Sequence, residues 1–171
     1  MRLRKLWMQL KKLWELIMLR VRTEIDVRNV SPNKLYSWLL DVDDERYRAW
    51  HPAHRGYQRV LENPEIVGSV VKFEEHIGGR RLGLAWEITQ AKLGESLGFK
   101  AKFPYPVNLS LGFTPIEVGT RVQHDLRIGF GGLVGNGIDL FVGNMIFTRS
   151  LARAVSSHAI QEFRNLESIL G

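Results

Sequence analysis

The chain has 171 residues, of which 44% are hydrophobic and six are proline, which is enough for one domain with a sizeable core. The absence of cysteine excludes a disulfide framework, thiolate metal sites and cysteine nucleophiles, and it fits a reducing compartment such as the cytoplasm. The net charge is +6, and residues 1–20 hold six basic residues and one acidic residue, a net +5. The remainder is nearly neutral, which argues against a nucleic-acid-binding domain.

Residues 1–20 have the pattern of a basic amphipathic helix. Leucine and tryptophan recur at three- and four-residue spacing, and the basic residues lie opposite them. Charges interrupt the segment too often for a transmembrane span or a signal peptide. Three alternatives remain: the helix lies on an anionic membrane surface as a peripheral anchor, packs on a partner such as the second subunit of a homodimer, or covers the protein's own sheet. The ligand-binding domain is then residues 21–171.

Residues 21–27 alternate between apolar and charged side chains, which predicts a strand with one buried face. Ser31 followed by Pro32 is typical of the start of a helix, and Leu35, Trp38 and Leu39 give that short helix an apolar side. The acidic residues 41–45 break it.

The middle of the chain reads as a series of strands about ten residues long. Turns that contain glycine or proline separate them, as in an antiparallel meander. The predicted strands are residues 69–77, 81–93, 96–103, 108–116 and 120–128.

One long amphipathic helix is predicted from about Val134 to Leu170. His158 and Glu162 lie one turn apart, within or beside its apolar side, so both side chains should point inward. A buried carboxylate costs several kcal/mol unless it is paired, hydrogen-bonded or bound to a metal. The sequence must therefore supply a partner.

The order of elements predicts an α+β fold, in which a curved antiparallel sheet wraps the C-terminal helix and leaves a cavity between them. An apolar, aromatic lining suits a flat hydrophobic small molecule. The predicted lining residues are Trp86, Phe99, Phe103, Leu111, Phe113 and Val155.

Strand alternation indicates which polar side chains enter this cavity. Glu75 should point in and Glu74 out, and His124 should also point in. Glu75 and His124, together with His158 and Glu162, would place two imidazoles and two carboxylates around one volume. This ligand set suits Zn²⁺ or Fe²⁺. The competing interpretation is a set of core histidines and ion pairs without a metal.

These residues resemble a known pattern. Residues 20–171 resemble the helix-grip superfamily of START domains, plant pathogenesis-related allergens and polyketide cyclases. The segments that carry a closer resemblance, to the diacetylphloroglucinol and phloretin hydrolases, are Tyr47, Trp50-His51-Pro52-Ala53-His54, Glu75 in FEEHIGG, and His158-x-x-x-Glu162 followed by Asn165-Leu166.

Those enzymes hold zinc and cleave the carbon–carbon bond between an acyl group and a phenolic ring. The resemblance implies that His54, Glu75, His158 and Glu162 are metal ligands, with His51 as the alternative first ligand and Tyr47 as a contact to the phenol. The hydrolases are longer than this chain, which places only its basic segment ahead of the first strand, so the resemblance is more specific for the site than for the substrate.

Two functions follow as hypotheses. The first is a small metal-dependent hydrolase in which an inward histidine, His124 or His51, shuttles a proton. The second is a non-enzymatic module that carries a lipid or another hydrophobic molecule and works at a membrane surface. A structural ion network in a cavity without activity is the third interpretation.

Overall fold

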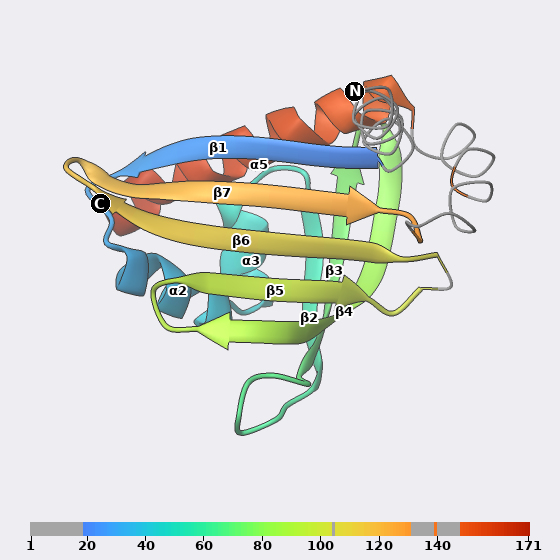
Figure 1. Ribbon diagram of the computed structural model, residues 1–171, viewed down its shortest axis with the longest axis horizontal. Coiled ribbons are helices and arrows are strands. Elements are labelled where there is room, and N and C mark those ends of the chain that lie inside the picture. The colour runs from blue at the N-terminus through green and yellow to red at the C-terminus, as the bar shows by residue number, and fades with distance from the viewer. Residues whose placement is uncertain (1–18, 104, 131–138, 140–147) are drawn as a thin grey trace, which may run out of the picture.

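The computed structural model describes residues 19–103, 105–130, 139 and 148–171. Its elements follow one another in the order β1 (Leu19–Arg28), α2 (Pro32–Asp41), α3 (Asp44–Trp50), β2 (His54–Leu61), β3 (Val70–Ile77), β4 (Arg80–Lys92), β5 (Ser96–Ala101), β6 (Val107–Ile116), β7 (Gly119–Ile128) and α5 (Arg149–Leu170). The strands form one sheet, and α5 runs along one face of it while β3 and β4 curve round toward the helix (Figure 1).

The sheet is antiparallel throughout, in the order β1-β7-β6-β5-β4-β3-β2. Strands β2 to β7 pair with their neighbours in sequence, as the predicted meander requires. The exception is β1, which forms one edge of the sheet by pairing with β7, from Leu19 opposite Ile128 to Arg28 opposite Gly119. The two short helices, α2 and α3, connect β1 to β2, the two edge strands of the sheet (Figure 1).

The alternation predicted for the first strand holds. Val21, Ile25 and Val27 are buried, and the charged residues between them are exposed. The charged side chains form ion pairs across the outer face of the sheet, such as Asp26 with Arg121 of β7. Apolar side chains on one face and paired charges on the other thus fix which face of the sheet meets α5.

Helix α3 and strand β2 were not predicted from the sequence. Residues 41–45, which were predicted only to end the preceding helix, also contain the N-cap of α3. The side chain of Asp43 accepts a hydrogen bond from Arg46 N at 2.8 Å. Strand β2 escapes detection because its pairing with β3 shifts register between His54 and Gly56 and again near its end. Such shifts interrupt the two-residue period on which the prediction depends.

The prediction of one continuous helix from Val134 to Leu170 is wrong at Thr148. This residue is extended, with φ −70° and ψ 158°, and its side chain accepts a hydrogen bond from Leu151 N at 3.2 Å. It is therefore the N-cap of α5 rather than an interior position. The residues predicted as helix before it lie, except for Asp139, outside the described residues.

The basic segment predicted over residues 1–20 also lies outside them, apart from its last two residues. Leu19 and Arg20 belong to β1 instead, and Arg20 pairs with Asp125 of β7. Among the described residues, no helix has both the length and the apolar composition that a membrane crossing requires.

Candidate metal centre

A cavity of about 830 Å³ lies between the sheet and α5. This volume is in the range of small-molecule sites. Of the six residues predicted to line it, five do so: Trp86, Phe99, Phe103, Leu111 and Val155. The sixth, Phe113, is 5% exposed in the core but does not reach the cavity.

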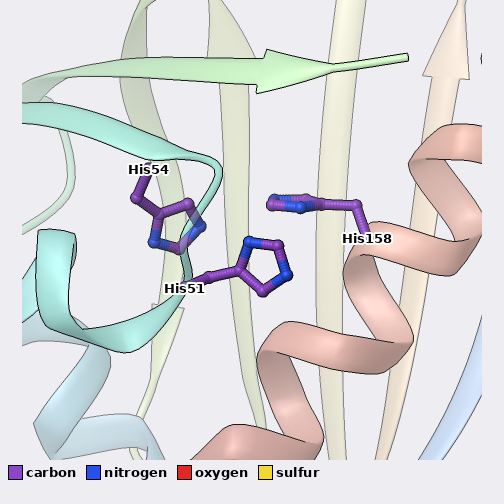
Figure 2. A group of neighbouring side chains, drawn as sticks. All are labelled: His51, His54 and His158. Atoms are coloured by element: carbon purple, nitrogen blue, oxygen red, sulfur yellow. The ribbon is translucent and has the colours of Figure 1, made fainter. Parts of the chain in front are cut away.

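His54, Glu75, His158 and Glu162 come together at one side of this cavity, and all of them except His54 line it. They arrive from three elements: the start of β2, the middle of β3 and two successive turns of α5. His54 pairs directly with Glu75 in the sheet, and α5 supplies the other two candidate ligands at the four-residue spacing that places them on one side. His54 and His158 face each other across the site (Figure 2).

The separations of the ligand atoms suit a metal ion. Glu162 Oε2 lies 3.4 Å from His54 Nε2 and 3.0 Å from His158 Nε2. The two oxygens of Glu75 lie further off, Oε1 3.9 Å from His54 Nε2 and Oε2 3.9 Å from His158 Nε2. A tetrahedral ion with bonds of about 2.0–2.1 Å places its ligand atoms about 3.4 Å apart, a value that these separations bracket.

Within the described residues, only one ring nitrogen of His54 makes a hydrogen bond. Its Nδ1 lies 2.8 Å from the backbone carbonyl oxygen of Tyr47, which can only accept, so Nδ1 carries the proton. In the neutral ring, Nε2 then presents a lone pair toward the two glutamates. A backbone carbonyl that fixes the opposite nitrogen of a metal-binding histidine is a common arrangement around metal ions.

Tyr47 touches two of the four residues. Its hydroxyl donates a hydrogen bond to Glu75 Oε1, and its ring stacks on His54 with centroids 4.0 Å apart. Burial and the adjacent Glu75 raise the pKa of Tyr47, so the hydroxyl stays protonated and remains a donor. The side chain is 2% exposed. Its hydroxyl, which the resemblance assigned to the substrate, is committed to Glu75 here.

His51 lies beside the cluster, but both of its ring nitrogens are engaged. Nδ1 accepts a hydrogen bond from Ala53 N at 3.1 Å, so Nε2 carries the proton and donates to Gln161 Oε1 at 3.2 Å. Burial lowers the pKa of His51. Its ring meets that of His158 edge-on, with centroids 4.5 Å apart (Figure 2). His51, His54 and His158 also form a group whose ring nitrogens lie close enough to hold an ion. Of the two candidates for first ligand, however, His54 has the ring nitrogen that makes no hydrogen bond within the described residues, while both nitrogens of His51 make one.

His124 lines the cavity as its strand phase predicted, but it is not part of the four-residue cluster. It is buried, and burial lowers its pKa, so the ring is neutral near pH 7. Its Nδ1 has no hydrogen-bond partner among the described residues. Strand alternation predicted correctly that His124 faces the cavity. It could not predict how far His124 lies from the four-residue cluster.

The two carboxylates differ in their electrostatic surroundings. Burial and the nearby charge of Glu162 raise the pKa of Glu75. Burial also opposes the charge of Glu162, but its contacts with His158 and His54 outweigh burial and lower its pKa. The contact with Glu162 likewise overcomes burial and raises the pKa of His158. The negative charge of Glu162 is thus balanced by the two histidines, whereas the charge of Glu75 lacks a full counterion.

The residues fit a divalent ion on two independent grounds. Buried polar atoms almost always have a partner, yet His54 Nε2 and His158 Nε2 make no hydrogen bond of acceptable geometry within the described part of the chain. Two imidazole nitrogens and two carboxylates are also a ligand set that Zn²⁺ and Fe²⁺ accept. A divalent cation between them would satisfy both nitrogens and neutralise both carboxylates.

Two contacts that sequence reasoning missed tie α3 to α5 behind the site. Trp50 Nε1 donates a hydrogen bond to the backbone oxygen of Glu162, and Asn165 Nδ2 donates to the backbone oxygen of Trp50 at 2.9 Å. Asn165 formed part of the matched motif without a stated role. Gln161, the partner of His51, gave no signal in the sequence, because a glutamine on a helix is ordinarily a solvent-facing residue.

Comparison with protein-family models and with curated protein sequences found no match. Solved structures do match. Ara h 8.0201 has a TM-score of 0.61 at 16% identity, over 89% of this chain and 97% of that one. Ginseng major latex-like protein 151 from Panax ginseng has a TM-score of 0.54 at 13% identity, over 83% and 97%. A START superfamily protein from Mycobacterium smegmatis has 0.51 at 16%, over 82% and 95%.

Proposed function

Because the chain has the helix-grip fold that the sequence predicted, we propose that it is a metal-dependent hydrolase acting on a hydrophobic, aromatic small molecule in its cavity. The observation that carries this proposal is the meeting of four candidate ligand atoms, from three elements, beside an apolar cavity that three of the four residues line. A structural ion pair would not need two buried imidazole nitrogens without hydrogen bonds.

His54, Glu75, His158 and Glu162 would hold the ion, which is Zn²⁺ or Fe²⁺. When bound, such an ion polarises a carbonyl oxygen or lowers the pKa of a water toward about 7. Three of the four residues, Glu75, His158 and Glu162, line the cavity, so the site adjoins the volume in which a substrate would lie. The aromatic lining would orient a flat ring against the sheet.

The reaction that the resemblance suggests is hydrolysis of an acyl phenol. The bond between the acyl carbon and the ring carbon breaks, the hydroxyl of a water joins the acyl carbon, and a proton reaches the ring carbon. His124 is the side chain placed to handle that proton, because its neutral ring faces the cavity and its Nδ1 has no partner among the described residues. His51 is less suited, since both of its nitrogens are engaged.

A second function rests on the cavity itself. About 830 Å³ bounded mainly by apolar side chains would hold a lipid or an aromatic molecule without any reaction. In that case the four polar residues would orient the polar end of the cargo.

Metal analysis of protein purified without a polyhistidine tag separates the two. About one zinc or iron per chain, together with hydrolysis of at least one member of a panel of acyl phenols, supports the hydrolase. Protein that carries no metal after incubation with Zn²⁺ and Fe²⁺, and that co-purifies with lipid, refutes it in favour of the carrier. A His124→Ala variant that keeps its metal but loses hydrolysis would support the assigned role of His124.

A further inference from the structure

Exposed residues line the cavity in two separate regions, at opposite ends of β3. Leu61 of the first region pairs with the first residue of β3, and Arg80 of the second pairs with its last residue. A ligand can reach an internal cavity only where the lining meets the surface, so both regions are candidate entrances. The second region contains Arg80, Arg81 and Phe103. The first combines the end of α2 with the end of β2 and the residues that follow it: Asp41, Arg59, Leu61, Glu62, Asn63 and Pro64.

Arg59 joins the two sides of the first region. Its Nη2 donates a hydrogen bond to the backbone oxygen of Leu40, near the end of α2, and its Nη1 donates to Glu62 Oε1, just beyond β2, at 3.1 Å. All three residues line the cavity. The side chains of Arg59 and Glu62 are 41% and 70% exposed, so water competes for these hydrogen bonds and their net strength is modest. One exposed guanidinium therefore bridges the helix and the β2–β3 segment at the edge of the cavity.

Ile66 has an unusual backbone conformation in the segment that joins β2 to β3, which projects beyond the sheet (Figure 1). Its φ is +69°, and among the described residues other than glycine only Asn29 shares a positive φ. Asparagine tolerates this conformation, but a β-branched residue adopts it only where its surroundings impose it. Ile66 N donates a hydrogen bond to Asn63 O at 2.9 Å, and Ser69 N donates to Ile66 O at 3.0 Å. The half-buried side chain packs against the core and lines the cavity. These contacts thus hold an apolar side chain at the cavity in a conformation that isoleucine disfavours.

The two regions differ in what an opening would require. At the first, Val60, Leu61 and Val67 are exposed by 55%, 56% and 41%, an apolar surface of the kind that surrounds ligand-binding grooves. Its two sides belong to different elements, a helix and a strand edge, which can separate. At the second, Arg81 pairs with Glu74, but these residues lie on β4 and β3, which the backbone ladder already joins. Breaking that ion pair would therefore open nothing.

We propose that hydrophobic ligands enter and leave the cavity between the end of α2 and the β2–β3 segment, and that Arg59 and Ile66 close this entrance. Opening breaks the two hydrogen bonds of Arg59 and moves Ile66 away from the cavity. Release of the disfavoured backbone at Ile66 offsets part of the cost of opening. The exposed apolar side chains beside the entrance favour uncharged, apolar ligands. This inference goes beyond the proposed function, needs no metal, and holds equally for a hydrolase and for a carrier.

The test is stopped-flow fluorescence of the full-length protein mixed with N-phenyl-1-naphthylamine, an uncharged probe that becomes fluorescent in apolar surroundings. Arg59→Met keeps most of the length of the side chain but removes both hydrogen bonds. It should raise the association and dissociation rate constants by about tenfold each, as expected for the loss of one or two hydrogen bonds of modest strength, and leave Kd nearly unchanged. Arg81→Met is the matched control, because it breaks an exposed ion pair at the second region. It should leave both rate constants unchanged.

A second pair of variants tests the apolar closure. Ile66→Ala removes most of a side chain that lines the cavity and should also accelerate uptake of the probe. Val67→Ala should not, because Val67 is exposed and is not among the residues that line the cavity. Circular dichroism of all four variants should match that of the intact chain.

The proposal is overturned if Arg81→Met accelerates uptake and Arg59→Met does not, because ligands then enter at the second region. It is equally overturned if Ile66→Ala and Val67→Ala take up the probe at the same rate, or if neither the intact chain nor any variant binds it.

Discussion

The ring of Tyr47 lies flat on the imidazole of His54, with centroids 4.0 Å apart and planes inclined by only 4°. It also stacks on Phe73, with centroids 5.5 Å apart. The same side chain donates its hydroxyl to Glu75, and its backbone oxygen accepts the Nδ1 proton of His54. One residue of α3 thus orients two candidate ligands that come from two different strands, which makes Tyr47 a positioning residue.

Tyr47→Phe should therefore weaken Zn²⁺ binding by about 10- to 100-fold, the usual effect of removing a hydrogen bond to a metal ligand. The ring stack and the backbone contact survive this change, so the fold should not suffer. Competition with a chromophoric chelator measures the affinity. Tyr57→Phe is the matched control, because its ring packs against Tyr47 at 5.7 Å while its hydroxyl lies beside Arg59. If the intact chain binds zinc and the two variants bind it equally, Tyr47 has no positioning role although the metal site stands.

Glu75→Gln should damage metal binding far more than Glu74→Gln. Glu75 faces the cavity, whereas Glu74 pairs with Lys72 and Arg81 away from it. Removing the carboxylate from the inward position deletes a ligand, while the outward change removes exposed ion pairs that contribute little to stability. Paired isothermal titrations with Zn²⁺ measure the difference. Equal losses in the two variants would contradict the inward assignment of Glu75.

Glu162→Gln should abolish tight metal binding and keep the fold. Its carboxylate is the one closest to both histidines, so its loss should exceed the 10- to 100-fold typical of residues behind the ligands. Glu167→Gln is the control on the same helix, since that carboxylate accepts a hydrogen bond from Arg28 N on β1 instead. Elemental analysis of purified variants reports the outcome. A Glu162 variant with full metal content would remove this residue from the ligand set.

Asp125 should contribute to stability in a defined range of acid. Two hydrogen bonds from Arg20, with support from Arg127, lower its pKa from 3.8 to about 2. A carboxyl group whose pKa is lower in the folded state stabilises above its unfolded pKa and loses that contribution as the pH falls toward about 2. Because both arginines are half exposed, about 1 kcal/mol is expected.

Asp125→Asn should therefore lower the free energy of unfolding near pH 6 and flatten its dependence on pH between about 4 and 2. Urea unfolding at several pH values measures this. Asp26→Asn is the control, since Asp26 also accepts two hydrogen bonds from an arginine of the neighbouring strand but is more exposed. If Asp26→Asn produces the larger effect, burial is not what strengthens the Asp125 pair.

Most of the fold could be predicted from short sequence patterns, because the strands and turns of the sheet each leave a pattern within a few residues. Alternation in residues 21–27 and turn signals between the later strands follow from burial of one face and from tight connections, both readable over a few residues. The start of α5 was missed because a helical period can continue past a cap, and only the extended backbone at Thr148 reveals the boundary. Strand β2 was missed because its register shifts conceal its period.

The site was less accessible to such reasoning. Periodicity placed Glu75, His158 and Glu162 inward, but His54 entered only through the resemblance, since it begins an irregular strand. Conversely, strand phase grouped His124 with the cluster, and in the structure it lines the cavity without joining the four side chains whose ligand atoms lie close together. The alternation of a strand indicates which face a side chain is on, but not how close it lies to residues of other elements. Tertiary contacts such as that of Tyr47 with His54 leave no pattern in the neighbouring sequence.

The pairing of β1 with β7 also constrains how the protein acquires its structure. Arg20 and Asp125, which it brings together, are 105 residues apart in sequence. During synthesis β1 has no strand to pair with until β7 has been made. It therefore stays unpaired while the strands between them are synthesised and form the meander. Long-range closure of this kind slows folding and leaves an apolar strand exposed to other chains in the meantime. Translation rate and chaperone supply should therefore affect the yield of this protein more than they affect proteins built from local contacts.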